Sequence, residues 1–151
     1  MTVSQLQSAG TIPAAVEIVP AVDAETPSSG PLSYDYALTD LRSAAVVAIP
    51  LAGAHPLQGL TEVVDALACA RPMILTRAPY FDFDIEEIGC GWWVERGDVG
   101  GWCERLTLAM ADRERLDEMG RAGWAWASES FNARLFADGV RRVLLGVAES
   151  L

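Results

Sequence analysis

Residues 44–76 read AAVVAIPLAGAHPLQGLTEVVDALACARPMILT, and this stretch decides the fold class. It begins with an apolar run over 44–50 and ends with another over 73–76, and both have the length of strands. Between them, apolar residues recur at the helical spacing i, i+3, i+4, i+7, i+8, namely Leu60, Val63, Val64, Leu67 and Ala68. Short strands that lack polar alternation, joined by an amphipathic helix, predict a parallel sheet whose strands are buried on both faces.

The flanking segments continue this alternation of helices and strands. A helix is expected from Ser33, a helical turn over 85–88, a strand over 91–95 and a last helix from about Phe131. Asp98 and Asp112 are expected to cap two more helices. The buried sides of these two helices should include Trp102, Leu106, Ala109 and Met110 in the first and Leu116, Met119, Gly123 and Trp126 in the second.

Nearer the N-terminus, a short helix over 2–10 and a strand over 14–19 are expected. The chain has 151 residues, which is enough for one domain with a core of its own. Residues 1–151 are therefore expected to form a single α/β domain, with a Rossmann-like parallel sheet flanked by helices.

Composition and charge exclude several classes of partner. The net charge of -10 disfavours nucleic acid and anionic membranes, because no basic surface is available to meet their phosphates. The N-terminus lacks the pattern of a signal peptide, and no apolar run approaches the roughly 18 residues of a membrane span. These features predict a cytoplasmic protein without a transmembrane segment.

Metal chemistry gains little support from the sequence. Cys69, Cys90 and Cys103 are odd in number and have no metal-binding spacing, so we expect small buried hydrophobic residues in a reducing compartment. His55 is the only histidine, which leaves no His-rich metal site. No metal ligand and no metal cofactor is therefore assigned.

The segment that follows the first strand has features of an anion site. Ligands of open α/β sheets bind outside the carboxyl ends of the strands, and this strand leads into a helix that begins near Gly59. Glycine permits close approach to the backbone, and the free N–H groups of Leu60, Thr61 and Glu62 would point at an anion. Asp65 shares a face with Thr61 at i, i+4 and could bind the diol of a ribose.

This pattern has a simpler interpretation as well. Gly59 and Thr61 could serve only as a helix start, with Asp65 on a solvated stripe. The chain has neither a Walker A lysine nor the GxGxxG pattern, so the common phosphate-loop signatures are absent.

Three further residues are candidates for the same site. His55 lies in the loop before the helix, and Arg77 and Tyr80 follow the strand over 73–76, where a base or a phosphate could be bound. An ordinary solvent-facing loop is the alternative for each of them. The acids Asp84, Glu86 and Glu87 are interpreted as a solvated helix start, and the tryptophans as residues of the core or of a domain interface. No catalytic residue can be assigned.

The same residues carry a resemblance to a known family. GLTEVVDALACARPMILT (59–76) resembles the turn, helix and strand in the C-terminal half of retaining glycosyltransferases of the GT-B fold, the glycogen-synthase-like superfamily. LTDLRSAAVVAIPL (38–51), IGCGWWVERGDVGGW (88–102) and MGRAGWAWASESFNARLFADGVRRVL (119–144) are similar, in the same order, to that family's flanking elements. The resemblance covers roughly residues 38–144.

The resemblance implies a nucleotide-diphosphate-sugar donor and a role for particular residues. In that family two glutamates spaced E-x7-E handle the donor, and nearby backbone amides hold the diphosphate. Asp65 matches the second acid, which binds the ribose, and Leu60 and Thr61 match the diphosphate turn. Leu57 stands at the position of the first glutamate, so the resemblance supports nucleotide binding more strongly than catalysis.

The resemblance further implies a partner and leaves alternatives open. A GT-B enzyme needs an N-terminal acceptor-binding domain, which we expect to lie outside this chain, so the chain alone is expected to be inactive. The alternative is a non-catalytic interaction module that retains the glycosyltransferase fold. A flavodoxin-like receiver also has this fold class, but it would require a lysine late in the chain, and the sequence contains no lysine.

Overall fold

Three parallel strands form the sheet in the part of the chain that the computed structural model describes, residues 34–51 and 57–148. They are β1 (Val47–Ile49), β2 (Met73–Thr76) and β3 (Gly91–Val94), in the order β1-β2-β3. In the register, Leu75 lies between Ile49 on one side and Trp93 on the other. The prediction of an α/β fold with a parallel sheet is confirmed. The helix expected over 2–10, the strand expected over 14–19 and His55 lie outside the described residues.

The two crossovers between the strands are helical. Helix α3 (Leu60–Ala68) connects β1 to β2, and the single turn α4 (Ile85–Ile88) lies between β2 and β3. Because all three strands run in the same direction, their carboxyl ends, at residues 49, 76 and 94, share one edge of the sheet, called here the carboxyl edge. The opposite side, where the strands begin, is called the amino edge.

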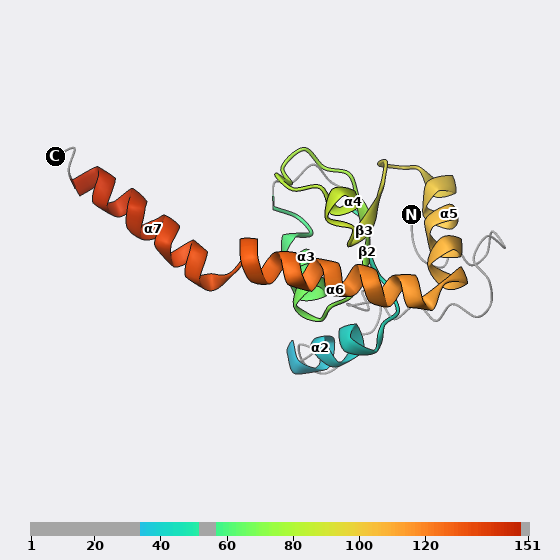
Figure 1. Ribbon diagram of the computed structural model, residues 1–151. Coiled ribbons are helices and arrows are strands. Elements are labelled where there is room, and N and C mark those ends of the chain that lie inside the picture. The colour runs from blue at the N-terminus through green and yellow to red at the C-terminus, as the bar shows by residue number, and fades with distance from the viewer. Residues whose placement is uncertain (1–33, 52–56, 149–151) are drawn as a thin grey trace, which may run out of the picture.

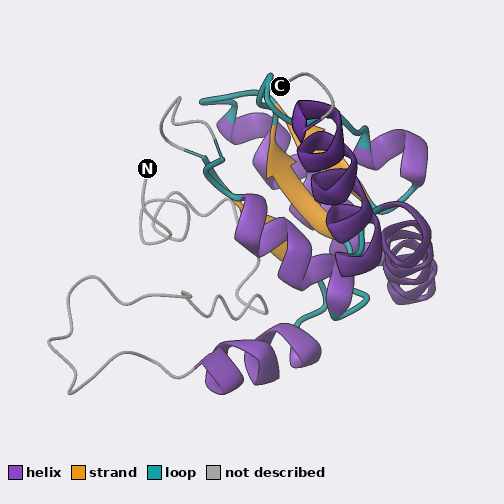
Figure 2. Ribbon diagram, turned by 90° about the vertical axis from the view of Figure 1, so that its left-hand side faces the viewer, coloured by secondary structure: helices purple, strands orange, loops and turns teal. Residues whose placement is uncertain are grey.

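The strands alternate between two apolar clusters, one on each face of the sheet. Met73, Leu75 and Trp93 pack on the face covered by α3 and α4, whose buried residues are Val63, Ala66, Leu67 and Ile85. Ile74, Trp92 and Val94 pack on the other face, against Trp102 and Ala109 of helix α5 (Val99–Ala111). Figure 2 shows the strands enclosed between helices in this way. Burial on both faces explains why β2 and β3 contain almost no polar residues.

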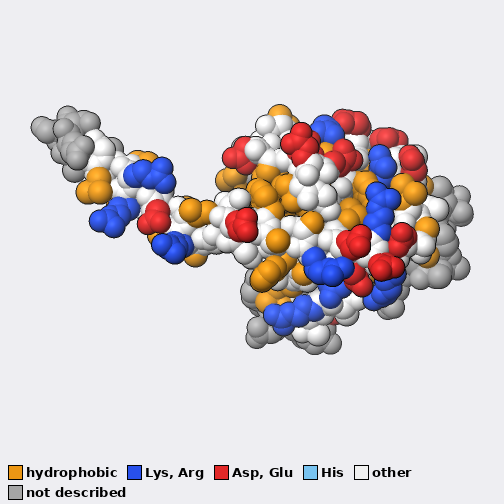
Figure 3. Space-filling model, in the orientation of Figure 1, with side chains coloured by type: hydrophobic (Ala, Val, Ile, Leu, Met, Phe, Trp, Pro, Cys, Tyr) orange, Lys and Arg blue, Asp and Glu red, His pale blue; other side chains and the backbone are white. Residues whose placement is uncertain are grey.

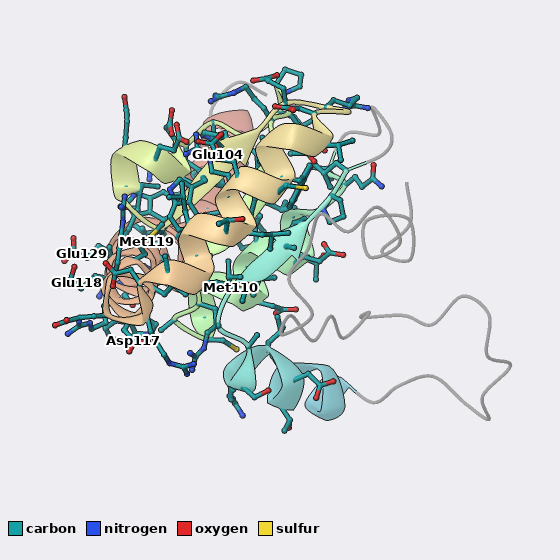
Figure 4. All side chains as sticks on the ribbon, turned by 90° about the vertical axis from the view of Figure 1, so that its right-hand side faces the viewer. Glu104, Met110, Asp117, Glu118, Met119 and Glu129 are labelled. Atoms are coloured by element: carbon teal, nitrogen blue, oxygen red, sulfur yellow. The ribbon has the colours of Figure 1, made fainter. Side chains whose placement is uncertain are left out.

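Helix α6 (Arg113–Ser130) covers the amino edge. A Cβ added at Gly120 would collide with the carbonyl oxygen of Ala70, just before β2. A Cβ added at Gly123 would lie 2.8 Å from Cβ of Cys90, just before β3, and 2.9 Å from Cδ2 of Leu67. Asp117, Glu118 and Glu129 extend outward from the same helix (Figure 4). The glycines therefore let the α6 backbone pack directly against the starts of two strands.

Two helices lie outside this layered body. Helix α2 (Tyr34–Ser43) precedes β1, and helix α7 (Ala133–Ala148) follows α6 and projects away from the sheet (Figure 1). Large apolar side chains of α7 are exposed, including Phe136 at 73% and Val143 at 66%. Among the described residues, no helix combines the length and the apolar character that a membrane span requires.

Three details of the predicted burial are wrong. Strand β1 is not buried on both faces, because it lies at the end of the described sheet, and Ala48 is exposed. In α3 the buried residues are Val63, Ala66 and Leu67, and Ala68 is exposed, so the buried stripe is displaced by about one residue from the expected one. Met110 in α5 is 46% exposed, whereas the burial of Trp102 and Ala109 is confirmed.

Candidate functional site

The turn before α3 lies at the carboxyl edge and contains the glycine that the sequence indicated. Gly59 is buried and has a φ of +83°, a conformation that a residue with a side chain rarely adopts. A Cβ at this position would lie 2.7 Å from Cδ2 of Leu51 and 3.3 Å from Cγ2 of Ile49. The glycine is therefore required by the turn itself and by its packing on the end of β1, whether or not a ligand approaches the backbone.

The first turn of α3 has no side-chain cap. Gly59 occupies the N-cap position, and the residue there makes no side-chain hydrogen bond. The N–H of Leu60 donates to the carbonyl of Leu57 at 3.3 Å, and the N–H of Val63 donates to the carbonyl of Gly59 at 3.0 Å. Between them, Thr61 and Glu62 are exposed. Uncapped N–H groups at the positive end of a helix dipole attract an anion.

Asp65 lies one helical turn beyond Thr61, on the same side of α3. Its side chain is half-buried, whereas Thr61 is exposed. The two residues thus form a hydroxyl and a carboxylate in line along the helix, starting at its uncapped end. This arrangement can present a donor to a phosphate and an acceptor to a pair of hydroxyl groups.

Tyr80 is brought to this turn from the loop after β2. Its hydroxyl donates a hydrogen bond to the carbonyl of Gln58 at 2.9 Å, and its ring centroid lies 4.9 Å from that of Phe81. The bond joins the loop that follows β2 to the turn that precedes α3. Among the candidates from the loop after β2, Tyr80 is thus placed beside Gly59.

Arg77 faces a different part of the carboxyl edge. Its Nε donates to Oε1 of Glu95 at 3.0 Å, and its guanidinium lies 5.1 Å from the ring centroid of Trp93. Both partners belong to β3 or to the residue directly after it. The structure therefore turns Arg77 toward β3, and it does not join the turn before α3.

The acidic cluster after β2 performs a structural task. Asp84 Oδ1 caps α4 by accepting the N–H of Glu86 at 2.8 Å, and it also accepts the indole N–H of Trp93 at 2.9 Å. The hydrogen bond from Trp93, followed by those from the backbone, lowers the pKa of Asp84 below its ordinary value of 3.8. Glu86 Oε1 accepts the backbone N–H of Trp93 at 3.2 Å. The two acids thus anchor α4 to β3.

Two polar residues of the carboxyl edge were missed by the sequence argument. Thr76 is 2% exposed, and its Oγ1 accepts the N–H of Leu51 at 3.0 Å, which ties the segment after β1 to the end of β2. Gln58 contributes a carbonyl to Tyr80. The available signal for Thr76 was a hydroxyl that closes an otherwise apolar strand. Gln58 acts through its backbone, for which the sequence gives no signal.

The cysteines behave as small apolar residues to different degrees. Cys90 is buried, and its burial raises the pKa of the thiol to about 11, so the thiol stays protonated and unreactive. Cys69 and Cys103 are half-buried, which departs from the expected burial. Among the described residues, no group of three histidine, cysteine or carboxylate side chains is positioned to hold a metal ion.

Comparisons with known proteins add no relative. A scan against protein-family models, a search of curated proteins and a search of solved structures each found no match to this chain. The interpretation of the site therefore rests on the geometry of the carboxyl edge.

Proposed function

We propose that this chain is the nucleotide-diphosphate-sugar-binding domain of a GT-B-type glycosyltransferase, which acts together with an N-terminal acceptor-binding domain outside this chain. The observation that carries the proposal is the uncapped start of α3 at the carboxyl edge of a parallel sheet, with Tyr80 bonded to the same turn. In open α/β sheets this edge is where ligands bind.

Each part of the donor has a counterpart in this region. The N–H and hydroxyl groups of Thr61 would hold the diphosphate, joined by the N–H of Leu60 once it leaves its 3.3 Å hydrogen bond to the Leu57 carbonyl. The Asp65 carboxylate would accept two hydrogen bonds from the ribose diol. The helix dipole supplies positive potential, so this mode of binding needs no metal ion.

The proposal assigns binding residues but no catalytic group. Leu57 stands where the resembled family has its sugar-handling glutamate, and its apolar side chain is 69% exposed. It also has a φ of +74°, which is uncommon for a residue other than glycine. Sugar transfer would therefore need groups from the acceptor-binding domain or a route that does not use this acid.

Isothermal titration with UDP and GDP tests the binding role. We expect saturable binding of one of these nucleotides, weakened by Asp65→Ala by about tenfold or more, since a hydrogen bond to a charged group contributes about 1.5–3 kcal/mol. Asp117→Ala is the matched control. Asp117 is also an aspartate on a helix, and it is exposed, but it lies on α6. Both variants change the net charge equally, so a difference between them reports the position of the acid and not the total charge.

Two results of this titration would contradict the proposal. One is the absence of binding at millimolar nucleotide by a protein whose circular dichroism shows the folded state. The other is equal affinity in the Asp65→Ala and Asp117→Ala variants, which would mean that the nucleotide does not contact Asp65.

A second candidate function is a non-catalytic interaction module with a degenerate glycosyltransferase fold. The observation that favours it is exposed apolar surface outside the sheet, at Trp124, with 54% exposed, and along α7. This candidate predicts no sugar transfer even when an acceptor-binding domain is supplied. A transfer assay with the two domains combined separates the two functions.

A further inference from the structure

Helix α7 presents an apolar face that nothing in the described chain covers. Phe136 is 73% exposed, Val140 42%, Val143 66% and Leu144 64%. Helix α7 follows α6 and points away from the sheet (Figure 1). A Cβ added at Gly139, in the middle of the helix, would meet no other atom within 4 Å.

The spacing of these residues is that of a helix-pairing seam. Ala133, Phe136, Val140 and Val143 recur at intervals of three and four residues, which is the period of the coiled coil. The arginines and the aspartate of α7, at positions 134, 138, 141 and 142, fall outside this seam. The residues beside the seam are Ala137, Gly139 and Leu144, so two such helices would meet without like charges between them.

A helix of this composition requires a packing partner. It has 16 residues, and two of the interior positions, Gly139 and Gly146, are glycine. Isolated helices of this length are marginal in water, and interior glycine weakens them further. Burial of the apolar face against a partner can offset the low stability of the isolated helix.

Charge decides between the partners that could cover such a face. Helix α7 carries three arginines and one aspartate, so the remainder of the chain holds eight arginines against twenty acids. Figure 3 shows acidic side chains at several places on the visible face of the body, with basic and hydrophobic side chains between them. The body would be repelled by an anionic membrane, although α7 by itself has the composition of a helix that lies on membranes.

We propose that α7 pairs antiparallel with α7 of a second copy of this chain. Antiparallel pairing places the two acidic bodies at opposite ends of a helix about 24 Å long, which is beyond the Debye length of roughly 8 Å at physiological salt. It also brings Arg141 and Arg142, in the C-terminal half of α7, toward the acidic body of the other copy. The pairing does not depend on nucleotide binding.

The mass of the full chain in solution tests this pairing. Size-exclusion chromatography with light scattering should give twice the chain mass of 16.2 kDa at high concentration. Val140→Asp places an unpaired charge in the middle of the seam and should raise the dissociation constant by about a hundredfold or more. Leu135→Asp is the matched control, because Leu135 is 43% exposed but lies on the side of α7 away from the seam. This variant should remain dimeric.

Three outcomes would overturn the proposal. They are the mass of a single chain at every concentration, equal effects of the two aspartate substitutions, and flotation of a monomeric chain with phosphatidylserine–phosphatidylcholine vesicles. The last result would assign the face to a lipid surface. Thermal unfolding of the body should be the same in both variants, and Val143→Asp provides a second substitution in the seam if Val140→Asp fails to fold.

Discussion

The two edges of the sheet are built in opposite ways. At the amino edge, α6 lies against the backbone of Ala70 before β2 and against the side chain of Cys90 before β3, with no space for a Cβ at Gly120 or Gly123. At the carboxyl edge, Gly59 packs on the end of β1, but a single hydrogen bond joins Tyr80 to Gln58 and α3 begins without a cap. The difference teaches that α6 occupies the amino edge at Gly120 and Gly123, while the carboxyl edge leaves polar groups available.

Gly120→Ala is expected to have the largest effect on stability, because it adds a methyl group at the closely packed amino edge. The added methyl group would meet the carbonyl oxygen of Ala70, and a backbone atom cannot move aside as a side chain can. We expect a loss of about 3 kcal/mol in the free energy of unfolding, measured by urea denaturation. Gly100→Ala is the control, since its Cβ would contact only Oδ1 of Asp98 at 3.5 Å, and it should change stability by less than about 1 kcal/mol.

Similar losses for Gly120→Ala and Gly100→Ala would contradict this account of the amino edge. Such a result would mean that α6 can shift away from the sheet at little cost. The close contact at Gly120 would then not distinguish the amino edge from the carboxyl edge.

Gly59→Ala tests whether the carboxyl edge is fixed by packing as well. We expect a loss of about 2 kcal/mol, from a positive φ that alanine disfavours and from the contact with Leu51. Gly97→Ala separates the two causes, because Gly97 has a φ of +80° but nothing lies within 4 Å of its added Cβ. Its loss should be about 1 kcal/mol. Equal losses of stability at both positions would show that the side chain of Leu51 moves aside at little energetic cost.

The pH dependence of stability gives a smaller effect at the carboxyl edge. The pKa of Asp84 is lower in the folded state than its ordinary value of 3.8, so the ionised carboxylate stabilises the fold. This contribution is complete above that ordinary value and is lost as the pH falls through the lower folded-state pKa. Asp84→Asn keeps an oxygen that can cap α4, but it should remove this part of the acid-induced loss, as measured by unfolding between pH 5 and 2.

An identical decline in stability for Asp84→Asn and the wild type would contradict the assignment. It would mean that the hydrogen bonds from Trp93 and Glu86 do not favour the charged form of Asp84. The acid sensitivity would then belong to other carboxylates.

The sequence predicted the layered fold well, because its signals are local. Apolar runs marked β2 and β3, and Asp98 and Asp112 marked the starts of α5 and α6, where each accepts a backbone N–H at about 3 Å. Periodicity could not fix the rotation of α3, because the buried stripe depends on where α6 lies, and α6 is distant in sequence. Ala66 is buried although the sequence did not place it in the stripe, and α6 contacts the neighbouring Leu67 at Gly123.

The candidate site was predicted only in part, for a similar reason. Gly59, Thr61 and Asp65 share one turn and one helix, so their proximity follows from local spacing. Whether Arg77 or Tyr80 reaches that turn depends on the path of a loop. The structure places Tyr80 beside Gln58 and directs Arg77 to Glu95, and no periodic pattern encodes that choice.

Tyr80→Phe is the smallest change and the most direct test of how the carboxyl edge is held. It removes the bond of 2.9 Å to the Gln58 carbonyl and keeps the ring beside Phe81. Because this bond is exposed to solvent, its loss should lower the free energy of unfolding by only about 0.5 kcal/mol. The turn it leaves unsupported begins α3, so hydrogen exchange at the amides of Leu60 and Thr61 should become faster. If the nucleotide binds there, its affinity should fall about twofold to threefold, in line with that small energy. A change in stability without any change in exchange at these amides would show that packing of Gly59 on β1 holds the turn by itself, and the two edges would then differ only in how much space they leave.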